Sequence, residues 1–332
     1  MSNLYITEQG AVLRKTGDRL IVSKDQENLL DVPCNKIDGV LIFGNVQFTT
    51  QAVHELFEHG IELAILTRTG KLIGQITSPV TKNIELRIEQ FKKYADEYFK
   101  LSLSQTIITG KLTNCLNLIR TFSYNHPEVD FDGETGEIRS CLREVPHANT
   151  IDSLMGIEGI GARRYFAGFR KMIRGAFNFD GRKKHPSPDP VNALLSFGYT
   201  LVFNEIASLL DGLGFDPYLG YFHSMKYGRA SLASDILEEF RASVDRFTLY
   251  LINNRVFKEE DFYTNPRGEG MYLTKEALKE YIGHYERFIN REFTHPETRE
   301  NTTLRKCFRI QAEKLANHIR SNGTYTTFTL EV

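Results

Sequence analysis

Residues 232–241 read LASDILEEFR and set acidic side chains into an otherwise apolar helical stretch. Asp235 and Glu238 are three residues apart, so on a helix they stack on one face. His223 lies twelve residues before Asp235. Two carboxylates and an imidazole could form a divalent-metal site with open positions for a substrate oxygen. An exposed acidic helix face balanced by Arg241, with His223 as a core or capping residue, explains the same pattern.

A further carboxylate stands in a glycine-rich segment, MGIEGIGARRYF, at residues 155–166. On a helix, Glu158, Ala162 and Tyr165 share one face. A glycine costs a helix about 1 kcal/mol relative to alanine, so the glycines here predict a close approach of another segment. They are Gly156, Gly159 and Gly161. The alternative is that Glu158 is a solvated residue near a helix start, where the macrodipole favours an acid.

Basic residues gather between Arg163 and Lys184, with eight Lys and Arg against one acid, Asp180. Aromatic side chains are interleaved with them. The whole chain has 41 basic and 42 acidic residues and a net charge of −1, which excludes a uniformly basic nucleic-acid binder. The local excess suits a groove for a phosphate backbone. A solvated basic helix face explains it equally well.

The chain has 332 residues, enough for about two domains, and its ordinary composition excludes a disordered or collagenous protein. Four scattered cysteines lack a C-x-x-C pair, so we expect reduced thiols. The N-terminus has no pattern of a secretory signal, which favours the cytoplasm. The apolar stretch 193–210 contains Asn204 and Glu205, so we expect a buried central helix and no membrane partner.

The hydrophobic period predicts an α+β fold, with a small N-terminal β domain at residues 1–82 and a larger α-helical domain at 83–332. Short β-type runs separated by turn residues predict strands at 4–7, 20–23, 40–43, 61–67 and 72–77. One helix is expected between Thr50 as N-cap and Gly60. Helical stripes follow at 84–98, 112–122, 278–289 and 304–319. The polar interval 125–150 predicts a loop.

Four motifs in this order resemble the CRISPR-associated (Cas) protein "one" family, the metal-dependent DNA endonuclease and integrase of spacer acquisition. They are G-I-E-G-x-G-A-R-R-Y-F around Glu158, D-P-V-N-A-L-L-S-F-G-Y at 189–199, G-Y-F-H ending at His223, and LASDILEEFR at 232–241. The β-then-α layout extends the resemblance over the whole chain.

The resemblance implies that the β domain dimerises and that the α-helical domain is catalytic. Its metal ligands map onto Glu158, His223 and Glu238, with Asp235 as an accessory acid that orients the site or takes part in catalysis. The metal would be Mg²⁺ or Mn²⁺. The partners would be double-stranded DNA with 3′ ends, a second copy in a homodimer, and the small Cas protein "two".

The expected reaction is strand transfer of short DNA fragments, or spacers, into a CRISPR array. We expect contacts to DNA from six side chains: Arg163, Tyr165, Lys183, Lys226, Arg229 and Arg241. A catalytically silent DNA-binding scaffold is the main alternative. A metal hydrolase acting on a small phosphodiester is another.

Overall fold

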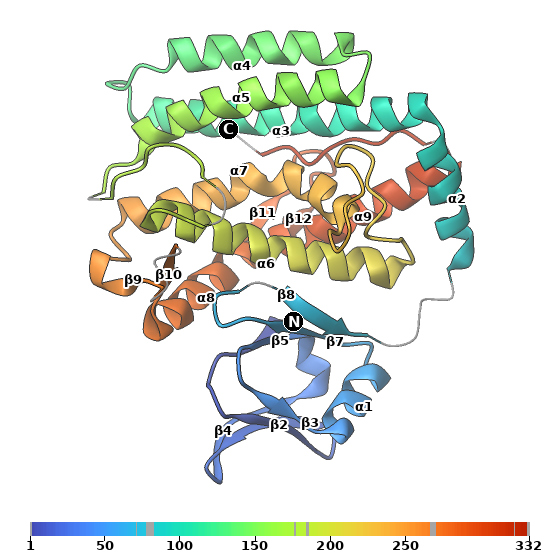
Figure 1. The fold of residues 1–332 in the computed structure, drawn as a ribbon, viewed down its shortest axis with the longest axis vertical. Coiled ribbons are helices and arrows are strands. Elements are labelled where there is room, and N and C mark those ends of the chain that lie inside the picture. The colour runs from blue at the N-terminus through green and yellow to red at the C-terminus, as the bar shows by residue number, and fades with distance from the viewer. Residues whose placement is uncertain are drawn as a thin grey trace. The chain divides into compact units, whose positions relative to one another are not determined.

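The computed structural model describes residues 2–70, 72–77, 83–175, 177–183, 186–265, 270–321 and 323–330. By the packing of its Cα atoms, the chain divides into two compact units (Figure 1). The first contains Met1–Thr81 with Leu273–Glu286, and the second contains Lys82–Tyr272 with Arg287–Val332. The predicted α+β class is confirmed, whereas the boundary between 82 and 83 stays a prediction, because Lys82 lies outside the described residues.

Two four-stranded sheets form most of the first unit. One runs in the order β1 (Ser2–Ile6), β5 (Ile37–Phe43), β7 (Glu62–Leu66), β8 (Leu72–Ile76), with β1, β5 and β7 parallel and β8 antiparallel. The other runs in the order β4 (Glu27–Pro33), β3 (Arg19–Lys24), β2 (Val12–Thr16), β6 (Gln47–Phe48). All five predicted strands are present. The sequence pattern missed β2, β4 and β6. Most side chains of β4 face solvent and offer no apolar alternation.

The helix α1 (Thr50–Glu58) completes this unit, together with the short helix η1 (Cys34–Lys36) and α8 (Lys275–Ile289), most of which belongs to it. Thr49, one residue before the predicted cap, accepts the N–H of Ala52 at 3.2 Å and caps α1. Gly60 follows the helix with φ of +64°, as predicted. Ala52 and Leu56 are fully buried in the core of the unit.

The second unit is helical. Its helices are α2 (Ile84–Ala95), α3 (Glu97–Asn125), α4 (Asp132–Glu144), α5 (Ile151–Met172), α6 (Pro190–Leu213), α7 (Ser231–Asn253) and α9 (Leu304–Ser321). Small elements join them: η2 (Val145–His147), η3 (Glu259–Asp261), the pair β9 (Phe262–Thr264) and β10 (Met271–Leu273), and the pair β11 (Glu292–Thr294) and β12 (Asn301–Thr303). Figure 1 shows α3, α4 and α5 side by side; α7 packs against both α3 and α6.

The helix α6 is the predicted buried central helix. Asp189 caps it by accepting the N–H of Asn192 at 2.8 Å, and Pro190 takes the first helical position, as the sequence predicts. Although α6 is long and apolar enough to cross a membrane, 67% of its most apolar window is buried inside the protein. Its packing against α7 and α9 is that of a core helix.

The predicted loop at 125–150 is wrong, because this interval contains α4. Phe131, Ile138 and Cys141 are buried, and the helix packs against α5. The acids that made the interval look like a loop have partners on α5. Glu134 and Glu137 pair with Lys171 at 2.7 Å and with Arg164 at 2.5 Å.

The predicted stripe at 84–98 is also corrected. The Asp96 carboxylate accepts the N–H groups of Tyr98 and Phe99, so that α3 begins anew and the stripe divides between two helices. Its members Ile84, Ile88 and Phe91 are about half exposed, whereas the buried face of α2 carries Leu86 and Gln90. The stripes at 278–289 and 304–319 are confirmed as the buried faces of α8 and α9.

Residues 324–330 form an extended C-terminal segment that lies against α3 and α7. The Asn114 side chain of α3 donates to the carbonyl oxygen of Phe328 at 2.8 Å and accepts the N–H of Leu330 at 2.7 Å. The buried carboxylate of Glu239, on α7, accepts the N–H of Phe328 at 2.8 Å and the Tyr325 hydroxyl at 2.5 Å. Burial raises the pKa of Glu239 to about 7.

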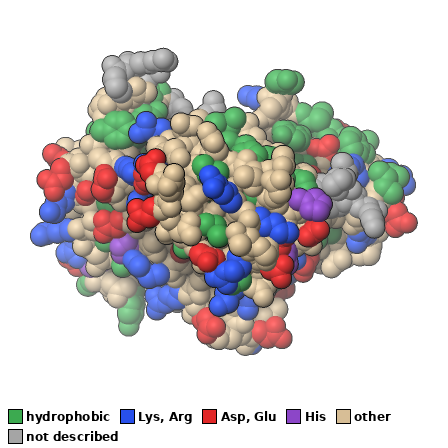
Figure 2. Space-filling model, turned by 90° about the horizontal axis from the view of Figure 1, so that it is seen from below, with side chains coloured by type: hydrophobic (Ala, Val, Ile, Leu, Met, Phe, Trp, Pro, Cys, Tyr) green, Lys and Arg blue, Asp and Glu red, His purple; other side chains and the backbone are tan. Residues whose placement is uncertain are grey.

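Charged side chains of both signs are interspersed on the face drawn in Figure 2, in keeping with the net charge of −1. In the helical unit, Arg164, Arg170 and Lys171 of α5 each pair with an acid.

The close approach of the C-terminal segment to α3 can be tested at Gly110. A Cβ added there would lie 2.6 Å from Cβ of Thr327, whereas one added at Gly156 of α5 would meet nothing within 4 Å. Gly110→Ala should lower the free energy of unfolding by about 1–3 kcal/mol through overpacking. Gly156→Ala should raise it by about 0.5–1 kcal/mol through helix propensity. Urea denaturation measures both, and equal effects would contradict this packing.

Candidate functional site

Three predicted ligands line the same cavity in the second unit. Glu158 lies on α5, His223 in the loop between α6 and α7, and Glu238 on α7. All three line one cavity of about 1060 Å³. The basic side chains among its walls outnumber the acids: Lys111, Arg163, Arg170, Lys171, Arg182, Lys183 and Arg241.

The two carboxylates share a cation that the sequence analysis missed. Lys111 of α3 is 8% exposed, and its ammonium pairs with Glu158 and, at 2.6 Å, with Glu238. Burial lowers the pKa of Lys111, but the charges of Glu238 and Glu158 outweigh it and raise that pKa above its ordinary value. Lys111 falls just before a predicted apolar stripe, and spacing within α3 does not mark a lysine as buried.

Asp235 positions His223. Its carboxylate, with no exposed surface, accepts the N–H groups of Tyr221 at 2.6 Å, Phe222 at 3.1 Å and His223 at 2.9 Å. It also lies 2.8 Å from Nδ1 of His223. Because a carboxylate only accepts, Nδ1 carries a proton in this contact, and Nε2 is the ring nitrogen left to face a ligand. That Nε2 lies 3.8 Å from Oε1 of Glu238.

Gly220, the glycine of the G-Y-F-H motif, occupies a position with no room for a side chain. A Cβ on Gly220 would lie 2.7 Å from the backbone of Ser231 and 2.9 Å from Oδ2 of Asp235. Only a residue without a side chain lets the loop come close enough for Asp235 to hold it. In α5, the predicted close approach is confirmed at Gly161, which faces Leu112, and is wrong for Gly156 and Gly159, which face open space.

Arg241, on the same helix as Glu238, contacts the same carboxylate oxygen as Lys111, Oε2. Its Nε donates to Oε2 of Glu238 at 2.8 Å, and its guanidinium lies over the ring of Tyr199 at 4.6 Å. Burial favours the neutral form of Glu238, but Arg241 and Lys111 outweigh burial and hold its pKa well below the ordinary range. Glu238 is therefore ionised at neutral pH.

Tyr165, an expected DNA contact, belongs to the core. It is 2% exposed, and its hydroxyl donates to Oδ2 of Asp245 at 2.7 Å. The Tyr199 hydroxyl donates to the other oxygen of that carboxylate. Burial raises the pKa of Asp245 to about 6. A side chain with so little exposed surface supports the cavity wall instead of offering a ring to a nucleotide.

The basic segment is largely neutralised by neighbouring acids. Arg164 and Lys171 pair with acids of α4, and Arg170 pairs with Asp180 at 3.3 Å. Lys183 lies 3.6 Å from the same Asp180. Lys184 lies outside the described residues.

Arg163 differs from these neighbours. It is exposed, it lines the cavity beside Glu158, and it makes no ion pair with any residue in the described part of the chain. Lys226 and Arg229 follow His223 in the same loop, where Lys226 is exposed and Arg229 half-buried. Arg163 is therefore the basic side chain of α5 best placed to meet an anion in the cavity.

By type, the residues present suit a divalent cation. Two carboxylates and an imidazole whose Nδ1 is held by Asp235 form a donor set for Mg²⁺ or Mn²⁺. In this structure their ligand atoms do not all lie within 4.8 Å of one another, and the Lys111 ammonium stands between the two carboxylates. The space between Glu158 and Glu238 already accommodates one positive charge, the Lys111 ammonium. A metal ion at that position would neutralise the two carboxylates in place of Lys111.

Removing the Lys111 charge tests this electrostatic arrangement. Lys111→Met removes the cation shared by Glu158 and the ionised Glu238, so the free energy of unfolding at pH 7 should fall by about 3–5 kcal/mol. The depressed pKa of Glu238 contributes stability above its ordinary value of 4.5 that is lost on acidification. Without Lys111 that pKa rises, so the difference from the wild type should shrink toward about pH 4.

Urea titrations at the two pH values measure both effects. Lys258→Met is the matched control, because Lys258 is 74% exposed and pairs only loosely with Glu260, at 3.6 Å. A loss of stability no greater than that of the control would contradict the buried pairing.

Comparison with known proteins identifies one family over most of the chain. The family described as "CRISPR associated protein Cas1" matches residues 4–287. The CRISPR-associated endonuclease Cas1 1 of Chlorobaculum tepidum is 33% identical over 97% of this chain and 96% of its own length. A CRISPR-associated exonuclease Cas4/endonuclease Cas1 fusion of Geobacter sulfurreducens is 32% identical over 95% of this chain, which spans 58% of the fusion.

Two solved structures have the same fold. A casposase bound to integration product superposes with a TM-score of 0.88 at 23% identity, over 99% of this chain and 93% of that one. A chain of a Cas6-RT-Cas1–Cas2 complex gives a TM-score of 0.83 at 26% identity, over 99% of this chain and 36% of that one.

Proposed function

This chain belongs to the Cas1 family of CRISPR-associated endonucleases, and we propose that it acts as a divalent-metal-dependent DNA integrase. In this proposal it transfers short DNA fragments into a CRISPR array and, as an endonuclease, cleaves DNA. The observation that carries the proposal is that Glu158, His223 and Glu238 all line one cavity with basic walls. A relative named as an endonuclease covers nearly the whole chain at 33% identity.

Glu158, His223 and Glu238 would hold Mg²⁺ or Mn²⁺, and the imidazole suits Mn²⁺ well, because it is softer than the oxygen ligands that Mg²⁺ prefers. When bound, such a cation polarises the scissile phosphate and neutralises charge that develops on its oxygens. The two carboxylates come from different helices, so both α5 and α7 must keep their packing on α3 for the ligands to stay together.

The protein's own side chains would orient this site. Asp235 holds the His223 ring with Nδ1 protonated, and so directs Nε2 toward Glu238. Arg241 fixes one oxygen of Glu238 and leaves the other facing His223. The attacking group would be a 3′-hydroxyl of the incoming DNA, or water in cleavage, so the reaction requires no protein nucleophile.

DNA would reach the cavity past Arg163, with Lys183, Lys226 and Arg229 as further phosphate contacts. Arg163 is suited to this role, because no acid among the described residues competes for its charge. The likeness to a chain of a Cas1–Cas2 complex at 26% identity supports Cas2 as the partner. We also propose a homodimer acting on double-stranded DNA with 3′ ends, in the cytoplasm, where such an array is found.

A catalytically silent DNA-binding scaffold is the second candidate, and one observation favours it. Lys111 pairs with both acids, so that Glu158 and Glu238 could serve only to neutralise a buried lysine. The two candidates separate on whether strand transfer depends on the carboxylate of Glu158.

Glu158→Gln tests the metal assignment. Because the amide is a weaker, uncharged ligand, strand transfer should fall by at least about 100-fold while DNA binding is kept. Transfer into a repeat-bearing plasmid is measured with Cas2 present, in Mg²⁺, in Mn²⁺ and in a chelator. Asp152→Asn, at an exposed position of the same helix, is the control. Unchanged transfer by Glu158→Gln would refute the assignment and favour the scaffold.

Arg163→Gln tests the path of the DNA. Loss of one phosphate contact should weaken binding at low salt and reduce the slope of log affinity against log salt by about 0.9. Arg164→Gln is the control, because Arg164 is already paired with Glu137 at 2.5 Å. Fluorescence anisotropy with duplex DNA over a salt series measures both variants. A salt slope lowered equally by the two would contradict the role of Arg163, and binding insensitive to salt would favour a small substrate.

A further inference from the structure

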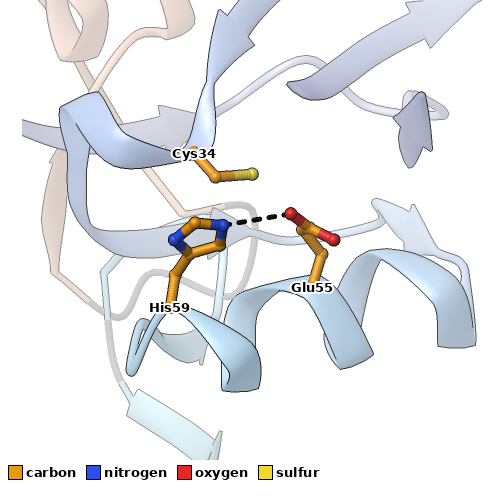
Figure 3. A group of neighbouring side chains, drawn as sticks. All are labelled: Cys34, Glu55 and His59. Carbon is orange, nitrogen blue, oxygen red and sulfur yellow. Dashed lines mark hydrogen bonds and ion pairs between the residues drawn. The ribbon is translucent and has the colours of Figure 1, made fainter. Parts of the chain in front are cut away.

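Side chains of types that can bind a metal also gather within the first unit. Cys34, Glu55 and His59 each offer a ligand atom, and these atoms all lie within 4.8 Å of one another. Figure 3 shows the sulfur of Cys34 beside the contact between His59 and Glu55. The proposed integrase chemistry uses none of the three.

The backbone holds this cluster from two separate segments. Cys34 begins η1 directly after β4, has no exposed surface, and its N–H donates to the carbonyl oxygen of Asp18 at 3.0 Å. Glu55 and His59 are four residues apart on one face of α1, and Nε2 of His59 lies 3.1 Å from Oε1 of Glu55. Ligands from a fixed loop and a fixed helix face are already partly ordered before a cation arrives.

The charges around Glu55 leave one of its oxygens for a ligand. Lys15 pairs with Oε2, and it lowers the pKa of Glu55, so that this buried carboxylate is ionised. The other oxygen, Oε1, faces His59. Burial raises the pKa of the Cys34 thiol, and the nearby Glu55 adds to that effect, so the thiol keeps its proton while no cation is bound.

We propose that Cys34, Glu55 and His59 bind a thiophilic divalent cation of the Zn²⁺ class. Thiolate and imidazole are ligands that Zn²⁺ prefers and Mg²⁺ does not, so this site differs in chemistry from the catalytic one. On binding, the sulfur–metal bond forms as the thiol loses its proton to solvent, and His59 contributes the lone pair of its neutral ring. Water from the solvent side completes the four-coordinate shell.

The geometry lets a cation reach the cluster and lets the three ligand atoms draw together around it. His59 lies at the end of α1 and its side chain is 36% exposed, so a cation can reach the buried sulfur from that side. Bond lengths of about 2.0–2.3 Å require the three ligand atoms to draw together. The exposed imidazole can move at little cost, whereas Cys34 and Glu55 are fixed in the core. Binding would join η1 to α1 and stabilise the first unit.

Co²⁺ is the probe for this site, because it takes tetrahedral sites and its bond to a thiolate gives a charge-transfer band in the near ultraviolet. The full-length protein, reduced and freed of metal with a chelator, should develop this band with one equivalent of Co²⁺ and lose it when Zn²⁺ is added. Glu158→Gln should keep the band, which separates this site from the catalytic one. Cys34→Ser should abolish it, and His59→Gln should weaken Co²⁺ binding by at least tenfold.

Cys307→Ser, at another buried cysteine, is the matched control and should keep the band. Absence of the band in the wild type, or its presence in a folded Cys34→Ser protein, would overturn the proposal. If Cys34→Ser fails to fold, His59→Gln decides, because His59 is partly exposed. Unchanged Co²⁺ affinity in that variant would refute the site. Strand transfer does not enter any of these measurements, so failure of the proposed integrase function leaves them interpretable.

Discussion

The structure of the proposed catalytic cavity depends on the placement of two carboxylates, those of Glu158 and Glu238, around the buried ammonium of Lys111. Carboxylates from two different helices can remain charged away from water only when opposite charges neutralise them. Lys111 lies between them, and Arg241 holds Glu238 from its own helix. The helices α3, α5 and α7 therefore meet at a charge-balanced centre, and the proposed cation would replace Lys111 as the partner of the two carboxylates.

The layers around this centre hold its members in place. Asp235 fixes the loop of His223 through three backbone N–H groups, and Gly220 lets that loop approach. Glu239, the residue after Glu238, faces away from the cavity and anchors the C-terminal segment. The two neighbouring acids of α7 thus have different roles. Glu238 faces the proposed metal position, and Glu239 binds the C-terminal segment to α7.

Much of this could be predicted from the sequence, because periodicity and motif spacing report local structure. The α+β class, the buried helix α6 and the candidate acidic ligands on α5 and α7 were predicted from such patterns. No such pattern marks Lys111. It pairs with Glu158 and Glu238, which lie 47 and 127 positions further along the chain and approach it only in the folded protein. The helix α4 was missed for a related reason. Its acids look like those of a solvated loop until α5 supplies their basic partners.

The same limit applies to Cys34, Glu55 and His59, since no local spacing joins a cysteine after a strand to a glutamate on a later helix. The two proposed sites differ in their donors: carboxylate-rich in the helical unit, and sulfur-containing in the β unit. A chain with four buried thiols and no C-x-x-C pair can still offer a thiophilic cation three ligands.

The central claim is that Glu158, His223 and Glu238 form one divalent-cation site. Equilibrium binding of Mn²⁺, followed by the electron paramagnetic resonance signal of the free ion, tests it most directly, because the readout does not depend on DNA or on Cas2. The account predicts that the wild type binds Mn²⁺ in the cavity and that Glu238→Gln loses that equivalent while the protein remains folded. Equal Mn²⁺ binding by the two proteins would contradict it.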